Sequence, residues 1–133
     1  MEDINLEKTV KTPEVHFVAS KGELMIGGIS IPENTVDFYH PLIYWITQYA
    51  MNPLGKTRFI VKFEYFNTSS SVVILNIFRM LSDIKSDVQI DWFYESDDSE
   101  MQELGDDYKR MLGNETAFNL IPIEVFIDSF FEI

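Results

Sequence analysis

Residues 57–94 read TRFIVKFEYF NTSSS VVILNIFRMLSDIKSD VQIDWFY, and this stretch carries the strongest fold signal in the chain. Its first ten residues alternate in the manner of a half-buried strand, with Phe59 and Val61 on one face. Apolar residues then recur at spacings of three and four, which predicts a helix over 69–85, and 88–94 reads as a second strand. A strand, a helix and a strand in this order predict a parallel pair with a right-handed crossover. The stretch therefore indicates an α/β fold.

The chain before this stretch extends the same pattern. Residues 14–19 and 23–31 are short apolar or alternating runs separated by a Ser-Lys-Gly turn, and we expect them to form a β-hairpin. An apolar stripe at helical spacing follows, with Asn34 as the expected N-cap. Pro41 lies inside the stripe, and proline costs roughly 3 kcal/mol in a helix interior. We therefore expect either a helix that starts near residue 40 or a kink at this proline.

The chain after the stretch adds a third helix and a last apolar segment. Ser96, Asp97 and Asp98 provide the cap for this helix, and the pair Gly113 and Asn114 ends it. The predicted order of elements is ββαβαβαβ. It predicts a sandwich in which three main helices pack on a mixed β-sheet of about five to six strands.

A chain of 133 residues fits one domain, which we expect over residues 14–133. Residues 1–13 are polar and end at a proline, which predicts a flexible leader. Residues 123–133 read IEVFIDSFFEI, an extended apolar tail. As exposed apolar surface this tail would need a cover, so we expect it to be an added edge strand or a docking segment.

The charge of the chain narrows the choice of partners. Ten Lys and Arg residues against 22 Asp and Glu residues give a net charge of −12, which repels nucleic acids and anionic membrane surfaces at long range. No targeting segment and no apolar run of roughly 20 residues is present, so we expect a cytoplasmic protein. The chain has no cysteine, which excludes disulfides and thiolate metal sites.

The motifs of common enzyme classes are absent from the sequence. None of the glycine-rich phosphate loops or the G-x-S-x-G elbow occurs. His16 falls in a predicted strand and His40 precedes a proline, so both fit structural roles better than a catalytic triad. The carboxylates of residues 95–107 lack the order of a calcium loop and fit a solvated helix face. We therefore expect no catalytic residue, no metal site, no cofactor and no nucleic-acid partner.

Five consecutive hydrogen-bonding residues, NTSSS, join the strand to the helix at residues 67–71. A helix N-cap needs one or two of them, and capping by Asn67 or Thr68 is one interpretation. The alternative is a phosphoacceptor site, because a phosphate at a helix N-terminus meets free N–H groups and the positive end of the helix dipole. The cluster follows the carboxyl end of a predicted parallel strand, where ligand and regulatory sites gather. The residues alone favour the cap and leave both open.

The chain resembles the SiaC-like family of small bacterial regulatory phosphoproteins. The fold of this family is similar to the STAS domains of anti-sigma-factor antagonists. The resemblance covers residues 13–122. It is carried by four stretches, Ile31-Pro32-Glu33-Asn34 before a helix with Trp45, Tyr65-Phe66-Asn67-Thr68-Ser69-Ser70, Trp92-Phe93-Tyr94, and the acidic helix from Glu100 to Asp107. It implies that Thr68 is the phosphorylated residue, with Asn67, Ser69 and Ser70 as contacts around the turn. Ser69, Ser70 and Ser71 are alternative acceptors, and Ser71 extends the family pattern by one hydroxyl.

The resemblance also implies a function as a partner-switching protein. A dedicated protein kinase would modify Thr68 and a PP2C-type phosphatase would restore it. The unmodified form would bind and activate a diguanylate cyclase, which links the protein to cyclic-di-GMP signalling and biofilm control. The alternative is an anti-sigma-factor antagonist with the same kind of switch. The tail beyond residue 123 is longer than the family pattern.

Overall fold

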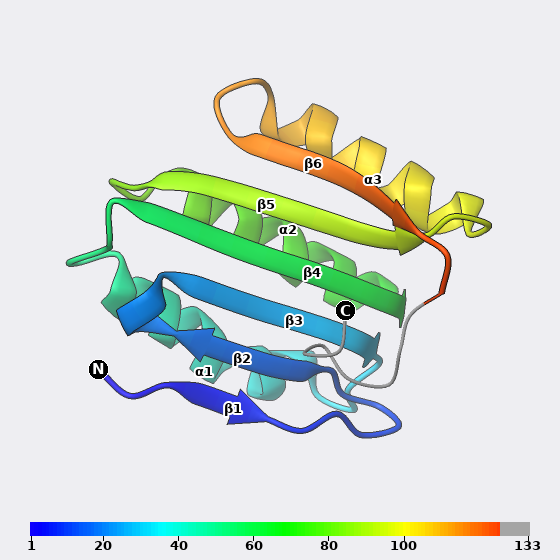
Figure 1. The fold of residues 1–133 in the computed structure, drawn as a ribbon. Coiled ribbons are helices and arrows are strands. Elements are labelled where there is room, and N and C mark those ends of the chain that lie inside the picture. The colour runs from blue at the N-terminus through cyan, green and yellow to red at the C-terminus, as the bar shows by residue number, and fades with distance from the viewer. Residues whose placement is uncertain (126–133) are drawn as a thin grey trace.

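The computed structural model describes residues 1–125, which form one mixed sheet of six strands (Figure 1). The strands are β1 (Ile4–Leu6), β2 (Glu14–Val18), β3 (Glu23–Ser30), β4 (Lys56–Phe66), β5 (Asp87–Glu95) and β6 (Ala117–Ile123). Their order across the sheet is the order of the sequence. The pairs β1–β2 and β2–β3 are antiparallel, and the pairs from β3 to β6 are parallel. The carboxyl ends of four strands therefore meet at one edge.

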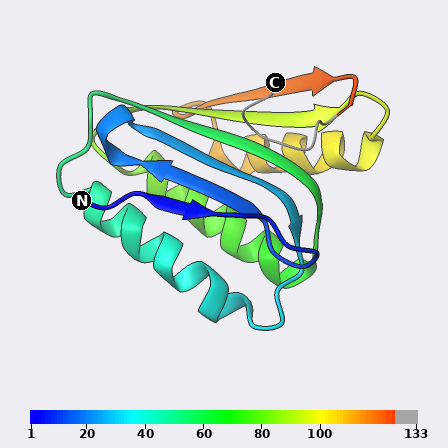
Figure 2. The same cartoon turned by 60° about the horizontal axis from the view of Figure 1, so that its bottom comes forward.

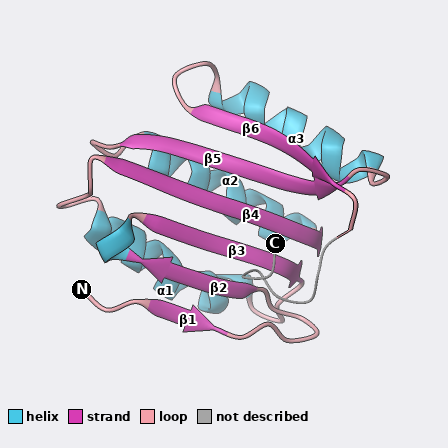
Figure 3. Ribbon diagram, viewed as in Figure 1, coloured by secondary structure: helices cyan, strands magenta, loops and turns pink. Residues whose placement is uncertain are grey.

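Three helices cover one face of this sheet (Figure 2). They are α1 (Thr35–Tyr49), α2 (Thr68–Ser82) and α3 (Ser99–Leu112), and a short 3₁₀ turn, η1 (Ala19–Lys21), links β2 to β3. Each helix joins two neighbouring parallel strands, so all three crossovers have the same hand and reach the same face. Figure 3 shows the resulting two layers, with α2 between α1 and α3.

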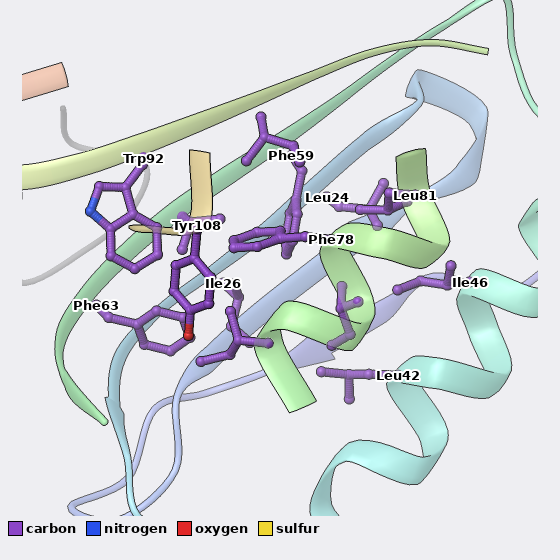
Figure 4. Close-up of a cluster of buried hydrophobic side chains, with 14 of the residues drawn as sticks. Leu24, Ile26, Leu42, Ile46, Phe59, Phe63, Phe78, Leu81, Trp92 and Tyr108 are labelled. Carbon is purple, nitrogen blue, oxygen red and sulfur yellow. The ribbon is translucent and has the colours of Figure 1, made fainter. Parts of the chain in front are cut away.

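The core lies between the sheet and the helices and is rich in aromatic rings (Figure 4). Phe78 of α2 is its centre: its ring centroid lies 5.8 Å from that of Phe59, 5.2 Å from that of Tyr108 and 6.4 Å from that of Trp92. These edge-to-face contacts hold β4, β5, α2 and α3 together, because such ring pairs add to the gain from burial. The first turn of α2 thus belongs to a helix that is packed against the core through Phe78.

The predicted α/β fold is confirmed, including the hairpin, the parallel pair β4–β5 and all three helices. Two of the expected N-caps are also found, since the side chain of Asn34 accepts from Asp37 N and that of Asp98 accepts from Met101 N. Helix α2 is apolar around most of its circumference because it packs on the sheet between two other helices. Most of its apolar residues are buried or packed against the core.

Within the flexible leader expected over residues 1–13, residues 4–6 form the strand β1. This strand pairs with β2, and Ile4 packs against the core. The indole N–H of Trp45 on α1 donates to the carbonyl oxygen of Glu2 at 2.8 Å, which ties the chain end to the helix layer. A three-residue strand gives too short a pattern to be recognised in a polar sequence.

Of the two expectations at Pro41, a helix that starts near residue 40 is wrong. Helix α1 begins at Thr35 and runs through the proline. Pro41 and Asp37 are both exposed, so the carbonyl of Asp37, which lacks an intrahelical donor, can bind water instead. The apolar tail was predicted over residues 123–133. Its first residue, Ile123, is the last residue of β6, and residues 126–133 lie outside the described residues. No helix within residues 1–125 is long and apolar enough to cross a membrane.

Candidate functional site

The polar cluster forms the first turn of α2 at the carboxyl edge of the sheet (Figure 1). Asn67 is the N-cap: its backbone is extended, and its side-chain oxygen accepts from Ser70 N at 2.9 Å. Its own N–H donates to the carbonyl oxygen of Ser30 at the end of β3, at 3.1 Å. The capping interpretation therefore holds for Asn67. The remaining residues of the cluster belong to the helix, and their four hydroxyls are in different environments.

Two of the four hydroxyls form hydrogen bonds at the surface. Ser69 Oγ lies 2.8 Å from Thr35 Oγ1, which joins the first turns of α1 and α2, and it also donates to the Asn67 side chain at 3.2 Å. Ser71 Oγ donates to the carbonyl oxygen of Thr68 at 2.7 Å. Thr68 itself is exposed, and its hydroxyl has no hydrogen-bond partner among residues 1–125. Thr68 thus presents the accessible and unengaged hydroxyl of the turn.

Ser70 is fully buried, and its hydroxyl belongs to a chain that runs under the turn. Ser70 Oγ donates to the carbonyl oxygen of Ser30 at 3.0 Å and lies 2.9 Å from Ser30 Oγ. Ser30 Oγ in turn lies 2.6 Å from the hydroxyl of Tyr39 on α1. Burial raises the pKa of Tyr39 to about 12, so this hydroxyl stays protonated. A kinase could not reach Ser70 without opening the turn, which argues against it as an acceptor.

Helix α3 holds the same turn from the other side. The hydroxyl of Tyr108 donates to the carbonyl oxygen of Ser71 at 2.9 Å. Burial raises the pKa of Tyr108 well above its usual value, so the group remains a donor. The turn is therefore attached to α1 through Tyr39, to β3 through Ser30 and to α3 through Tyr108. Sequence reasoning missed all three residues.

The electrostatic setting of the turn is that of a helix N-terminus. Ser70 N is bonded to the cap and Ser71 N to the carbonyl oxygen of Asn67, while the N–H groups of Thr68 and Ser69 have no acceptor in the part of the chain that the structure describes. Such free N–H groups carry the positive end of the helix dipole. No acidic side chain occupies the first turn of α2. The turn can therefore accommodate an added negative group.

Three residues that neighbour the turn, in the chain or through a bonded residue, have large exposed apolar side chains. Val72 follows Thr68 by one helical turn and is 65% exposed. Val36 is next to Thr35, whose hydroxyl bonds to Ser69, and is 72% exposed. Tyr65, two residues before the N-cap at the end of β4, is 53% exposed. We call these three residues the apolar rim. Exposed apolar side chains around a polar centre are typical of a protein interaction surface.

The face of the sheet opposite the helices holds a second polar group that sequence reasoning also missed. The carboxylate of Asp91 is buried and accepts from Arg58 Nε at 2.7 Å and from Gln89 and Asn119 at 3.0 Å. These bonds connect β4, β5 and β6, so we interpret the group as structural. A charged residue inside the strand VQIDWFY, with an arginine in the neighbouring strand, was the available signal.

A further concavity lies away from the turn. A groove of ≈ 620 Å³ lies between residues 1–4 and the outer face of α1, with Tyr44, Trp45 and Gln48 among its walls. None of the residues 67–71 lines it. Within residues 1–125 no group of three or more His, Asp or Glu side chains is arranged to hold a metal ion.

Comparisons with known proteins identify the family and the fold of the chain. The family model described as SiaC family regulatory phosphoprotein matches residues 6–123. A curated relative, an uncharacterized protein of Pseudomonas aeruginosa strain UCBPP-PA14, is 23% identical over 112 residues, which cover 82% of this chain and 89% of the relative.

Two solved structures have the same fold. The crystal structure of apo-SiaC from Pseudomonas aeruginosa has a TM-score of 0.77 at 22% identity and covers 92% of this chain and 98% of its own. A second match is the structure of the diguanylate cyclase SiaD in complex with its activator SiaC, from the same organism. Its TM-score is 0.73 at 21% identity, and the match covers 90% of this chain and 98% of the matched chain. The family model spans strands β2 to β6, the three helices and the first turn of α2, and on that basis this chain belongs to the SiaC family of regulatory phosphoproteins.

Proposed function

We propose that this protein is a phosphorylation-controlled regulator, not an enzyme, whose unmodified form binds and activates a diguanylate cyclase in the cytoplasm. Phosphorylation of Thr68 by a protein kinase switches it off, and a PP2C-type phosphatase switches it on again. Cyclic-di-GMP signalling, and through it biofilm control, is the output. Support comes from the family's description as regulatory phosphoproteins and from the relative that is solved as the activator of a cyclase.

The observation that carries the proposal is the difference between Thr68 and its three neighbours. The hydroxyl of Thr68 is exposed and unengaged, whereas Ser69 and Ser71 donate to neighbouring oxygens and Ser70 is buried. A kinase needs an accessible hydroxyl that can turn toward the transferred phosphoryl group. Thr68 meets this requirement without a structural change, and the same position is the acceptor implied by the family resemblance.

A phosphate at Thr68 would act on docking through local charge and desolvation. It would add about −1.5 to −2 charges next to the apolar rim of Val36, Tyr65 and Val72. A partner that covers this rim must then strip water from a dianion, which costs more than the apolar contact returns. The buried bonds of Ser70 and Ser71 need not break, so the switch requires no refolding of the domain.

Variants at Thr68 test the switch with the purified cyclase from the native host. Thr68→Val keeps the shape of the side chain and should activate the cyclase as the wild type does while it resists modification. Thr68→Glu should bind the cyclase about tenfold more weakly or worse, because a charge enters the interface. Thr47→Val, at an exposed threonine near the C-terminal end of α1, is the matched control and should behave as the wild type in both respects. A Thr68→Glu protein that binds and activates like the wild type would refute the switch.

The partners are tested in the native host. Affinity capture of the tagged protein followed by mass spectrometry should recover a diguanylate cyclase together with a kinase and a phosphatase. The intact mass of the same sample should show a phosphorylated fraction, and fragmentation should place the phosphate on Thr68. Recovery of an anti-sigma factor with a kinase fold in place of the cyclase would instead support the anti-sigma-factor antagonist.

A further inference from the structure

The buried hydroxyls under the turn form a chain with only one possible direction. Each hydroxyl has one hydrogen to donate. Ser70 uses its hydrogen on the carbonyl oxygen of Ser30, so at the 2.9 Å contact between the two serines the hydroxyl of Ser30 must be the donor. The hydrogen of Ser30 is then used, and Tyr39 must donate at the 2.6 Å contact. The direction of donation is therefore Tyr39 to Ser30, Ser30 to Ser70, and Ser70 back to the Ser30 carbonyl.

This chain ends on the atom that also fixes the helix cap. The carbonyl oxygen of Ser30 accepts from Ser70 Oγ and from the backbone N–H of Asn67. Asn67 in turn caps the helix through Ser70 N. Because Tyr39, Ser30 and Ser70 are all at most 1% exposed, water cannot replace a lost member at low cost. The orientation of the cap therefore depends on a tyrosine of another helix.

The next residue along α2 is held from the opposite side. The Tyr108 hydroxyl of α3 donates to the carbonyl oxygen of Ser71, the residue after Ser70. Two consecutive residues of the first turn are thus fixed to three different elements, while Thr68 and Ser69 on the outer side of the turn remain exposed. Capping alone would require fewer tertiary hydrogen bonds than the first turn of α2 makes.

We propose that Tyr39, Ser70 and Tyr108 are positioning residues that hold the first turn of α2 in one orientation, so that Thr68 is presented to its enzymes and its partner on an immobile turn. The inference rests on the proposed function in taking Thr68 as the acceptor. A turn that is already ordered lowers the entropy cost for any protein that recognises it. It also fixes the direction of the free N–H groups that a phosphate at Thr68 would meet.

The test uses the complete protein and needs no kinase. Tyr39→Phe and Tyr108→Phe each remove one oxygen and keep the aromatic ring, and Ser70→Ala removes the middle of the chain. Amide hydrogen exchange of residues 68–71 is measured by NMR. We expect exchange of Ser70 and Ser71, the two amides of the turn that are hydrogen-bonded, to rise about fivefold in each variant, the factor that corresponds to one lost net hydrogen bond. Core amides of β4 and β5 should change less.

A second measurement separates positioning from stability. Phosphothreonine is incorporated at position 68 during translation, and its phosphate is titrated by ³¹P NMR well below the melting temperature. Ordered N–H groups favour the dianion, so we expect the phosphate of the wild-type protein to titrate at a lower pH than free phosphothreonine. In the Tyr39→Phe protein the titration should move toward that of the free amino acid. A merely structural role would lower the melting temperature and leave the titration unchanged.

The matched control is Tyr49→Phe. Tyr49 lies on the same helix as Tyr39, is equally buried, and bonds to Thr57 Oγ1 at 2.7 Å near the start of β4, away from the turn. This control should leave both the exchange at the turn and the phosphate titration unchanged. The inference is overturned if Tyr39→Phe and Tyr108→Phe have no effect on either readout, or only the effect of the control. Absence of phosphate on Thr68 in the native host would refute the proposed function instead, whatever these variants show.

Discussion

At the residue scale, Asp91 is the group whose ionisation contributes to folding stability. Burial by itself would raise its pKa, but hydrogen bonds from Asn119, Gln89 and Arg58 and the charge of Arg58 outweigh this effect, so the pKa lies below its ordinary value. Between the two pKa values the unfolded chain binds more protons than the folded one. The stabilisation by Asp91 is therefore complete above the unfolded pKa and is lost as the pH falls through the lower, folded value.

This sign gives a prediction for Asp91→Asn. At neutral pH the variant should lose about 2 kcal/mol of free energy of unfolding, because an amide cannot accept from all three donors. The difference from the wild type should shrink as the pH falls below about 4. Urea unfolding of both proteins at a series of pH values measures it, and the subtraction removes the contributions of the other carboxylates. A difference that stays constant down to low pH would contradict the interpretation.

Gly105 of α3 is a residue at which the packing of the core leaves no room for a side chain. A Cβ atom there would lie 2.6 Å from Trp92 Nε1 and 2.6 Å from a methyl carbon of Leu120. The indole cannot easily move, because its N–H donates to the carbonyl oxygen of Met101 at 3.0 Å. Gly105→Ala should therefore lower the free energy of unfolding by about 1–3 kcal/mol, although alanine is the better helix former.

The control for this prediction is Gly55→Ala, where the added Cβ would meet no atom within 4 Å. This change should alter the free energy of unfolding by no more than about 0.5 kcal/mol. Chemical denaturation of the two variants in parallel measures both values. If the two variants were equally stable, the close packing of α3 on Trp92 would not be the reason for a glycine at position 105.

At the scale of elements, two helices begin in the same way but should differ in their effect on function. Asn34 caps α1 through Asp37 N at 3.1 Å, and Asn67 caps α2 through Ser70 N at 2.9 Å. Asn34→Ala and Asn67→Ala should each cost about 1 kcal/mol of stability. Only Asn67→Ala should also weaken binding to the cyclase, because its cap orients the turn with Thr68. Equal losses of binding in the two variants would mean that binding follows stability alone.

The elements that sequence reasoning predicted correctly are those with long periodic patterns. The strand of β4 and the stripe of α2 each span more than ten residues, and the signals of hydrophobic period and N-cap agree there. Sequence reasoning failed where contacts with other elements or with solvent determine the local structure. Strand β1 has three residues and is formed by pairing with β2, and Pro41 is accommodated because the carbonyl of Asp37 faces solvent. Neither effect is visible in a local pattern.

The candidate site was likewise predicted only in part. The sequence indicated a polar turn at the carboxyl end of a parallel strand, and the structure has the turn there. The support beneath it was not predictable, because Ser70 meets Ser30 at a separation of 40 residues and Tyr108 meets Ser71 at a separation of 37. The sequence around these serines and tyrosines does not indicate that they are hydrogen-bonded to each other. Which of four adjacent hydroxyls is accessible is likewise a property of tertiary structure.

At the scale of the whole molecule, the net charge of the chain determines how a phosphate can act. The chain already carries −12, so about two further charges change its long-range field only modestly. At physiological salt, fields are screened beyond about 8 Å. The proposed block of docking must therefore arise next to Thr68, from the cost of desolvating the phosphate against a partner that covers the apolar rim. Long-range repulsion, unlike the cost of desolvation, would weaken as the salt concentration rises.

Salt therefore distinguishes the two causes. We expect that protein with phosphothreonine at position 68 binds the cyclase poorly at about 0.1 M salt and does not recover at about 1 M, where the screening length falls to about 3 Å. Isothermal titration at both concentrations measures this, with unmodified protein as the control for direct effects of salt on the cyclase. Recovery to the affinity of the unmodified protein at high salt would assign the block to long-range repulsion. In that case the position of Thr68 beside the apolar rim would be unimportant, and a charge placed elsewhere on the carboxyl edge of the sheet should block docking equally well.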